Sequence, residues 1–305
     1  MDHRAILITG ASGFIGGSIT DRLVDRAEIR SLTSHPAKNR FGGRVRSFAY
    51  DFDWPEQMSD AFRGVDVFVN SYYVRFRYGG ATFERAVDHT RTLIALAREA
   101  GVRKIVHVSV SKADERSSLP YYCNKGRIER LVRESGIDYT ILRPAIVVGF
   151  GDILINNIGF FLRRLPVFTV FGRGDYRVQP ITVETFADIA AEAIDGRHSN
   201  ATLPVAGPSD WKFVDVVRAV RTAVGSRALI VRAPAAAALA GLRVAGWFLG
   251  DVVLTADEIR GLTGEYLYVD QPMRRGVDLN EWLSRDDVRS TLGMRYESEL
   301  ARHFR

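Results

Sequence analysis

A tyrosine and a lysine stand four residues apart, at Tyr121 and Lys125, in a segment predicted to be helical. Residues four apart on a helix lie on one face, so both side chains project in the same direction. An ammonium group stabilises a nearby phenolate, which makes a tyrosine usable as a general acid or base. The pair therefore predicts proton transfer at a substrate oxygen by Tyr121. There are two alternatives. Tyr121 and Lys125 could be an ordinary surface pair, or the acid or base could be the neighbouring Tyr122, which is three residues from Lys125 and lies off the motif.

A glycine-rich turn near the N-terminus is the second chemical signal. It lies between a predicted strand and a predicted helix. Gly10 permits the tight turn, Gly13 lets the backbone approach a pyrophosphate, and Gly16 lets helix and strand pack closely. The helix start supplies free N–H groups and a positive dipole end for the phosphates. We predict a dinucleotide site formed by Gly10, Ser12, Gly13, Phe14, Ile15 and Gly16.

The end of the second predicted strand, Ile29–Thr33, indicates the type of dinucleotide. NAD-binding sites usually place an acidic residue here to bind the ribose 2′-hydroxyl, and this sequence has none. The polar and basic residues that follow could bind a 2′-phosphate, although they could also form a solvated loop. We therefore predict NADP(H) rather than NAD(H), which stays possible. The residues concerned are Ser34, His35, Lys38 and Arg40, and Asp51 and Phe52 are expected to flank the adenine.

These residues must be positioned by regular elements. Runs of β-branched residues alternate with amphipathic stretches over the first two-thirds of the chain, which is typical of a parallel sheet covered by helices. We predict an α/β protein with a Rossmann-type doubly wound parallel sheet and a smaller, mostly helical C-terminal substrate lobe. The dinucleotide-binding domain would comprise residues 1–149 plus about 182–206, and the substrate lobe about 150–181 and 207–305. Predicted strands are Arg4–Thr9, Ile29–Thr33, Val45–Ala49, Val65–Asn70, Arg103–Ser109, Tyr139–Leu142 and Ala201–Ala206; predicted helices are Phe14–Asp25, Pro55–Phe62, Ala81–Ala100, Tyr121–Glu134 and Thr182–Asp195.

Composition narrows the possible environments. The net charge is +6, but the basic residues are scattered, so no nucleic-acid partner is expected. The single cysteine, Cys123, and an N-terminus without the shape of a signal peptide suggest a cytoplasmic protein. The stretch Ala233–Leu254 is largely apolar, yet Arg243 and Asp251 would be costly in hydrocarbon. We predict a packed helical cap there and expect no membrane contact.

The order of these motifs resembles the short-chain dehydrogenase/reductase superfamily, in its extended or atypical branch. This branch includes NmrA-like proteins, accessory subunits of respiratory complex I and the NAD-dependent epimerase/dehydratase family. The resemblance covers roughly the first 210 residues closely. The segments that carry it are Thr9–Gly16, Gly64–Ser71, Lys104–Ser111, Tyr121–Lys125, Asp138–Gly149 and Val178–Ala190.

The resemblance also implies roles for individual residues. Lys125 would contact the nicotinamide ribose, and a serine beyond the fifth strand would orient the substrate oxygen. Val110 occupies the expected serine position, which leaves Ser109 or Ser111 for this role. Further cofactor contacts are implied at Asn70, Ser71 and Pro144.

Other positions bear on the substrate. Relatives that act on sugar nucleotides carry an asparagine where this sequence has Ile146, so epimerase or dehydratase chemistry becomes the less favoured alternative. The aromatic runs Tyr72–Phe76 and Phe160–Phe161 either line a pocket for an apolar or ring-bearing substrate or belong to the core. Gln179 either contacts the substrate or fixes a loop. The six histidines show no metal-ligand spacing, and we expect His107 to be a satisfied core residue.

Together these features predict an NADP(H)-dependent oxidoreductase acting on a carbonyl/alcohol pair of a small molecule. Tyr121, Lys125 and Ser109 or Ser111 would form the catalytic set, without a metal. A monomer or homodimer is expected. The alternative from another class is a protein that holds NADP(H) without catalysis, as a structural or sensing ligand, since Val110 replaces the expected serine.

Overall fold

The computed structural model describes residues 4–72, 74–234, 236, 250–298 and 300. Contacts between Cα atoms divide the chain into two compact units. The first comprises Met1–Pro144 and Val183–Val205, and the second comprises Ala145–Thr182 and Ala206–Arg305. Both units are therefore built from two separate stretches of sequence. The predicted division had placed the breaks near residues 149, 182 and 206.

The first unit is built on a parallel sheet. Its strands follow the order β11-β6-β5-β4-β1-β2-β3. β1 lies between β2 and β4, with Ile6 opposite both Ile29 and Val67. From β1 the chain adds β2 and β3 on one side and then β4, β5, β6 and β11 on the other. This order is the doubly wound topology that was predicted. The strands are β1 (Ala5–Thr9), β2 (Glu28–Thr33), β3 (Val45–Ala49), β4 (Val67–Asn70), β5 (Lys104–Val108), β6 (Asp138–Pro144) and β11 (Ala201–Ala206).

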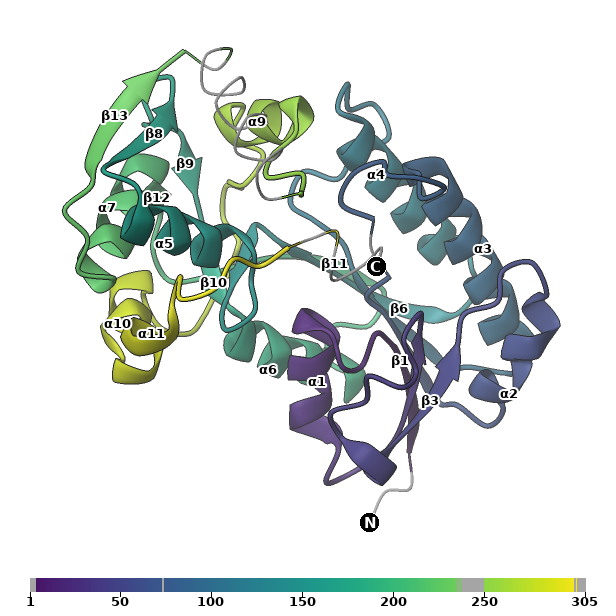
Figure 1. Cartoon of the computed structure of the whole chain (residues 1–305). Coiled ribbons are helices and arrows are strands. Elements are labelled where there is room, and N and C mark those ends of the chain that lie inside the picture. The colour runs from purple at the N-terminus through teal and green to yellow at the C-terminus, as the bar shows by residue number, and fades with distance from the viewer. Residues whose placement is uncertain (1–3, 73, 235, 237–249, 299, 301–305) are drawn as a thin grey trace. The chain divides into compact units, whose positions relative to one another are not determined.

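Helices cover both faces of this sheet (Figure 1). Leu7, Phe68 and Ile105 point from the central strands into a core shared with α2, α3 and α4. On the opposite face α1 packs against α6, where the Ser18 hydroxyl donates to the Val183 carbonyl. The helices are α1 (Phe14–Leu23), α2 (Ser59–Phe62), α3 (Phe83–Glu99), α4 (Pro120–Arg133) and α6 (Val183–Ile194), with short 3₁₀ turns η1 (Gly42–Arg44) and η2 (Pro55–Met58).

Glycines terminate the two long helices that precede central strands. Gly101 follows α3 with φ +74°, and Gly136 follows α4 with φ +75°. Glycine adopts this left-handed conformation without steric cost, which ends a helix and reverses the chain. The amide of Val102 then donates to the Ala97 carbonyl, so the chain enters β5 directly. The glycines thereby set where the strands bearing the site residues begin.

The second unit packs around its own core, in which Trp282 is only 1% exposed. Valines of α7 and α11 and leucines of α10 surround it. β7 pairs with β10, β8 with β13, and β9 with β12, so the unit contains three short strand pairs. Its elements are β7 (Ile146–Val148), α5 (Leu154–Arg164), β8 (Val167–Phe171), β9 (Arg177–Val178), β10 (Pro180–Thr182), β12 (Trp211–Lys212), α7 (Phe213–Ala223), β13 (Leu229–Ala233), α9 (Ala256–Thr263), β14 (Met273–Arg274), α10 (Leu279–Ser284) and α11 (Asp286–Thr291).

The predicted fold class is confirmed, and the second unit differs from expectation in one respect. A mostly helical lobe was predicted, but β8 and β13 form a parallel pair with Leu229 opposite Val167. Most of the predicted cap over Ala233–Leu254 lies outside the described residues. Among the described helices, none is long and apolar enough to cross a bilayer.

Candidate functional site

The glycine turn connects β1 to α1 and is fixed at its base by β2. Gly10 has φ +68°, and its amide donates to the Leu32 carbonyl at 2.8 Å. The next amide, of Ala11, donates to the Ser31 hydroxyl at 3.2 Å. Only glycine adopts the Gly10 conformation without strain. The turn is therefore held rigidly before any ligand binds.

Close packing at Gly16 makes this turn specific for glycine. A Cβ atom at Gly16 would lie 2.3 Å from the Gly10 carbonyl oxygen, and one at Gly13 would lie 3.2 Å from the same atom. The first distance is impossible for a real side chain, because it is well inside van der Waals contact. Gly16 therefore lets α1 approach β1 closely, as the motif predicts.

The beginning of α1 is free to receive an anion. Its N-cap is Gly13, no side chain caps it, and its first turn contains no acidic residue. Gly13 is exposed, while Ser12, Phe14 and Ile15 are half-buried. The first N–H groups of a helix have no intrahelical acceptor, and they carry the positive end of the dipole. The turn and α1 together fit the pyrophosphate of a dinucleotide.

Four polar or basic residues follow β2, as predicted for a 2′-phosphate site. Arg40 lies against α1, where Nη2 is 2.5 Å from an Asp21 carboxylate oxygen. The Ser34 hydroxyl hydrogen-bonds His35 Nδ1 at 3.0 Å, and Lys38 is exposed. Three of the four side chains are therefore exposed and His35 is half-buried. Arg40 has a carboxylate partner that a phosphate would have to displace.

An aromatic cluster follows β3. Phe52 stacks on His89, with ring centroids 3.6 Å apart and ring planes 5° apart. Tyr72 hydrogen-bonds His89 Nδ1 at 2.9 Å, and its ring lies tilted against Phe52 with centroids 5.9 Å apart. Burial and the Arg85 cation lower the pKa of His89, so the ring is neutral near neutral pH. Asp51 accepts from the Trp54 amide and closes the turn beside this cluster.

The ends of β1 and β4 are joined by Thr9 and Ser71. The Ser71 amide donates to the Thr9 hydroxyl at 2.7 Å, and the Ser71 hydroxyl donates to the Thr9 carbonyl. Asn70 is fully buried, and its side-chain oxygen accepts from the Tyr72 amide. The Asn70 amide nitrogen, Nδ2, has no partner within the described part of the chain. A buried donor of this kind fits a bound cofactor or an ordered water.

His107 lies beside Asn70 on the neighbouring strand and was expected to be fully satisfied. Its Nδ1 donates to the Asn70 carbonyl at 3.2 Å, but Nε2 lacks a partner among the residues that the structure describes. Burial and the Lys125 ammonium hold the pKa of His107 well below its usual range. The ring is therefore neutral, with an acceptor nitrogen left over. The prediction is right for one ring nitrogen only.

Tyr121 and Lys125 lie one turn apart on α4, as predicted. Lys125 is 6% exposed, and its ammonium donates to the Val108 carbonyl at 3.1 Å. Burial lowers the pKa of Lys125 to about 8, against the opposing effect of Glu129. Tyr121 is half-buried and packs edge-to-face on Phe83 at 6.0 Å. The structure thus seats the ammonium at the carboxyl end of β5.

Ser109 takes part in a buried ionic network that the sequence did not reveal. Its hydroxyl donates to Glu129 at 2.5 Å, and the same carboxylate is paired with Arg143 and Arg133. Glu129 is fully buried, which explains why three donors surround it. The only sequence signal was that Glu129 follows Lys125 by four residues on one helix face. Ser109 can orient a substrate oxygen only if this bond breaks.

The remaining predicted residues lie beyond the end of β5. The amides of Ser109 and Ser111 donate to the carbonyls of Leu142 and Pro144, so the ladder with β6 continues past Val108. Ser111 is fully buried, and Val110 is 8% exposed. Alternation places Ser109 and Ser111 on one face and Val110 on the other. The two serines therefore share a face.

A loop crosses α4 immediately beside Lys125. A Cβ atom on Gly126 would lie 2.5 Å from the Glu115 amide nitrogen and 2.6 Å from the Asp114 carbonyl carbon. The backbone of the loop therefore touches the helix backbone. This contact keeps the segment after Ser111 close to the face that carries Lys125.

Residues of the second unit bear on two of the open alternatives. Gln179 is fully buried, and its amide nitrogen donates to Asp210 and to the Val269 carbonyl, both at 2.9 Å. Its oxygen accepts from the Val269 amide, so the side chain fixes a loop. Phe160 and Phe161 pack against Tyr296, at 5.5 and 6.1 Å.

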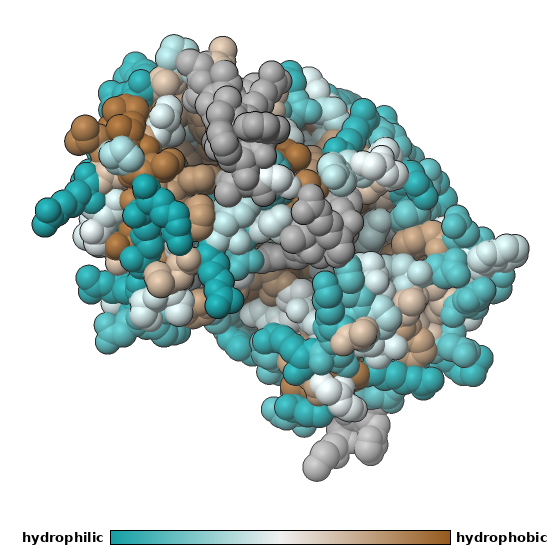
Figure 2. Space-filling view, viewed as in Figure 1, coloured by the Kyte–Doolittle hydropathy of each residue, from teal (hydrophilic) through white to brown (hydrophobic). Residues whose placement is uncertain are grey.

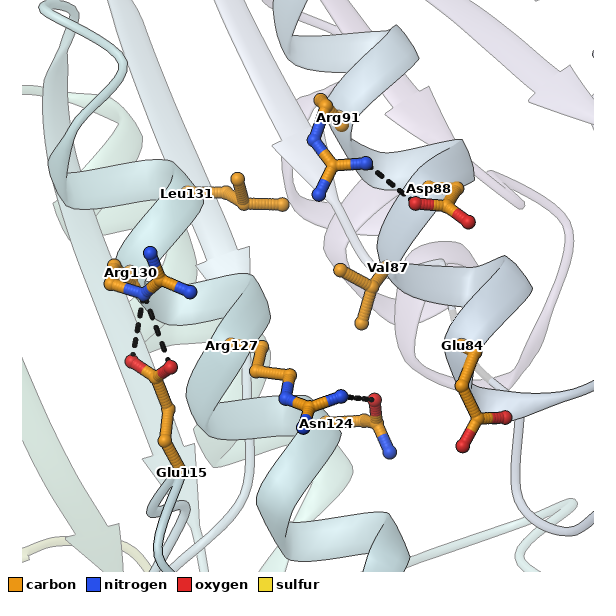
Figure 3. A pocket seen from close by; sticks show the side chains of 9 residues that line it. All are labelled: Glu84, Val87, Asp88, Arg91, Glu115, Asn124, Arg127, Arg130 and Leu131. Carbon is orange, nitrogen blue, oxygen red and sulfur yellow. Dashed lines mark hydrogen bonds and ion pairs between the residues drawn. The ribbon is translucent and has the colours of Figure 1, made fainter.

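A groove runs between α3 and α4 (Figure 3), with a volume of about 440 Å³. The arginine side chains that line this groove already have partners. Arg91 pairs with Asp88, Arg130 pairs with Glu115, and Arg127 hydrogen-bonds Asn124. No predicted cofactor or catalytic residue lines it. Within the described ranges, no group of three histidine, cysteine or acidic residues is placed to hold a metal ion.

Comparison with known proteins identifies the kind of site. A family model described as NAD(P)H-binding matches residues 10–149. The photosystem II assembly factor Ycf39 of Cyanophora paradoxa is 23% identical over 248 residues, covering 76% of this chain and 72% of that protein. Two solved structures share the fold. The NADPH-dependent quinone oxidoreductase QOR2 of Escherichia coli, complexed with NADPH, has a TM-score of 0.72 at 23% identity, covering 92% of this chain and 98% of that one. The triphenylmethane reductase of Citrobacter sp., complexed with NADP(H), has a TM-score of 0.66 at 20% identity, covering 86% and 98%.

The doubly wound sheet, the rigid glycine turn and the uncapped helix start define a dinucleotide-binding Rossmann unit. Residues 10–149 match the NAD(P)H-binding family model, and the chain is similar to atypical short-chain dehydrogenases/reductases.

Proposed function

We propose that this protein is an NADP(H)-dependent oxidoreductase that interconverts a carbonyl and an alcohol on an apolar or ring-bearing small molecule. The observation that carries the proposal is the buried Lys125 ammonium, anchored on the Val108 carbonyl one helical turn from Tyr121. Burial of a cation destabilises the folded state, so a buried lysine indicates a structural or a chemical role. Its place at the carboxyl end of a strand in the sheet that also carries the glycine turn favours the chemical one.

The roles of the residues follow from their chemistry. The bound nicotinamide would supply or accept the hydride at the carbonyl carbon. In reduction, Tyr121 donates its phenolic proton to the substrate oxygen and is reprotonated from solvent; in oxidation, it takes that proton away. Lys125 stabilises the phenolate through its charge. Ser109 or Ser111 orients the oxygen, and the Ser109 hydroxyl must leave Glu129 to do so.

Two observations favour NADP(H) over NAD(H). No acidic residue follows β2 at the position that would bind a ribose 2′-hydroxyl. Arg40 lies against α1 instead: its Nη2 is 2.9 Å from where a Cβ on Gly17 would stand. A guanidinium beside α1 can exchange the Asp21 carboxylate for a phosphate, since both are anionic acceptors that bind a guanidinium in a bidentate manner. The two reductases of similar fold were solved with the phosphorylated cofactor.

The substrate class rests on the same two reductases, one named for quinones and the other for triphenylmethane dyes. Both substrates are ring-bearing. Ile146 stands where relatives that act on sugar nucleotides carry asparagine, which disfavours the epimerase or dehydratase alternative.

A non-catalytic role is the second candidate, and one observation favours it. The Ser109 hydroxyl is held in the Glu129 network, and Val110 occupies the neighbouring position. A protein that only holds NADP(H) needs no hydroxyl for a substrate oxygen. The assembly factor among the relatives is named for a role other than catalysis.

Replacement of Tyr121 by Phe tests the proposal. We expect turnover of NADPH with a panel of quinones and aromatic carbonyls to fall about 10²- to 10⁴-fold, because the acid/base is lost. The NADPH dissociation constant should stay within about twofold, because proton donation contributes to turnover and not to cofactor binding.

Tyr122→Phe is the matched control, because it removes the hydroxyl of the adjacent tyrosine; its turnover should stay near that of the unchanged protein. Loss of turnover in this variant alone would transfer the role to Tyr122. Tight NADPH binding with no oxidation across the panel would select the non-catalytic alternative.

A further inference from the structure

The pair of strands β8 and β13 exposes an apolar face in the second unit. Leu229 is 65% exposed, Leu165 47%, Val167 40% and Val231 38%. Figure 2 shows hydrophobic residues gathered where Figure 1 places these two strands. The opposite face of the pair packs on the core through Phe168, Val170 and Ile230. We call the exposed side chains of Leu165, Val167, Leu229 and Val231 the β8–β13 patch.

Register explains why these side chains gather on one side. Leu229 lies opposite Val167, and Val231 lies opposite Thr169. Side chains alternate between the faces of a strand, so Val167, Leu229 and Val231 share one face with Thr169, and Leu165 precedes β8. The exposed apolar side chains are therefore neighbours and not isolated residues, which is the kind of exposure that marks an interaction site.

The charge around the β8–β13 patch is predominantly positive. Residues 160–176 and 218–233, which contain both strands, hold seven arginines, one aspartate, and no lysine or glutamate. Arg227 lies two residues before β13, Arg232 lies within it, and both are exposed. Neither forms an ion pair with any residue that the structure describes. A partner that covers this surface must therefore carry negative charge.

We propose that the β8–β13 patch docks on the surface of an anionic lipid bilayer. Leu165, Val167, Leu229 and Val231 would enter the boundary between headgroups and acyl chains, and Arg227 and Arg232 would contact lipid phosphates. This is a contact with one leaflet and not a span. It revises the expectation of no membrane contact, which rested on the charges that interrupt Ala233–Leu254.

Size and charge disfavour a protein partner. Two adjacent five-residue strands present a face of roughly 160 Å². A stable protein interface needs about 800 Å² from each partner. A second copy would also bring two arginine clusters together. A peptide strand added to the open edge of β13 would leave the apolar side chains on the face uncovered, whereas a bilayer covers the whole face.

Vesicle sedimentation of the full-length protein tests the proposal. We expect binding to phosphatidylcholine vesicles that contain phosphatidylglycerol, weak binding without it, and release as salt increases. Leu229→Ser should lower the apparent partition coefficient about five- to tenfold through lost apolar burial. Arg227→Glu with Arg232→Glu should lower it at least about tenfold.

The control variants make the same kinds of substitution at exposed residues of the first unit. Arg63 and Arg103, with side chains 80% and 74% exposed, replaced together by Glu match the change in net charge. Trp54→Ser, at a residue 61% exposed, matches the apolar change. Both should bind vesicles like the unchanged protein.

Four results would overturn the docking surface: no sedimentation with either vesicle, equal losses in the control and patch variants, no effect of Leu229→Ser, or a dimer in light scattering that Leu229→Ser dissociates. Circular dichroism of each variant separates loss of fold from loss of binding. None of these outcomes depends on oxidoreductase activity, so a failure here leaves the proposed function standing.

Discussion

A single carboxylate organises the charged face of α4. Glu129 is fully buried and accepts from Ser109, Arg133 and Arg143. The same carboxylate opposes the effect of burial on the pKa of Lys125. An unpaired carboxylate in this place would cost several kcal/mol, so the two guanidinium groups are required for the fold. Glu129 therefore fixes Ser109 and supports the Lys125 charge at the same time.

The buried Lys125 predicts an unusual pH dependence of stability. Its pKa is about 8 in the fold, below the ordinary value near 10.5, so the unfolded chain holds the proton more tightly. The cost of the buried charge is fully present below pH 8 and is relieved as the pH rises from about 8 to 10.5. The shift corresponds to a few kcal/mol, on the order of 3.

Denaturant unfolding of the unchanged protein and of Lys125→Met, across this pH range, measures the effect. We expect the free energy of unfolding of the unchanged protein to rise relative to that of the variant. Lys212→Met, at an exposed lysine, should run parallel to the unchanged protein. A constant difference between unchanged protein and Lys125→Met would contradict the lowered pKa.

At the scale of elements, the glycine turn works because it keeps α1 against β1 and leaves the helix start open. Gly16 allows the close approach, and Gly13 leaves the N-cap without a side chain. The phosphates would then meet backbone N–H groups and not solvated side chains. Affinity for the dinucleotide should depend on this backbone geometry more than on any one side chain.

Gly16→Ala tests that dependence. The new Cβ would lie 2.3 Å from the Gly10 carbonyl oxygen, so the turn must move. We expect NADPH affinity to fall at least about tenfold, the loss of roughly one good hydrogen bond to a charged group. Gly43→Ala is the control: the structure shows no atom within 4 Å of its Cβ and no positive φ. Isothermal calorimetry on both variants would contradict the argument if Gly16→Ala bound NADPH normally.

Short sequence patterns correctly predicted strands whose bounds depend on neighbouring residues in the sequence. Val45–Ala49 and Ala201–Ala206 are strands with the predicted bounds, because each is a short run bounded by residues that interrupt a strand. β8 and β13 were missed because they pair in parallel across some sixty residues of sequence, with no turn to mark the pairing.

The same distinction holds within the site. The spacing of Tyr121 and Lys125 is visible in the sequence, because a helix converts it into a shared face. The bond between Ser109 and Glu129 joins a strand to a helix twenty residues later, and Arg143 joins from another strand. Such partners are chosen by tertiary packing, which no local pattern records.

At the scale of the molecule, the first unit is discontinuous in sequence. The family match ends at residue 149, but the sheet gains β11 beside β6 from residues after 200. α6 covers α1, with Arg22 paired to Asp188 and Arg26 to Asp195. The stretch that matches the family therefore lacks one strand and one covering helix of its own fold.

A truncated chain of residues 1–149 should consequently fail to fold. Removal of α6 exposes the buried side of α1, including Ile19 and Leu23, and removal of β11 leaves β6 as an open edge. We expect aggregation and no stabilisation by NADPH, whereas NADPH at one hundred times its dissociation constant should stabilise the full chain by about 2.7 kcal/mol. Thermal unfolding with and without NADPH measures this. A soluble 1–149 fragment whose melting temperature NADPH raises would show that α6 and β11 are dispensable.

The contact of the Asp114–Glu115 backbone with Gly126 has a practical consequence for redesign. Residue 126 follows Lys125 and has no room for a methyl group, so even alanine would push the crossing loop away from α4. A mutagenesis library aimed at altering substrate preference should therefore hold residue 126 constant.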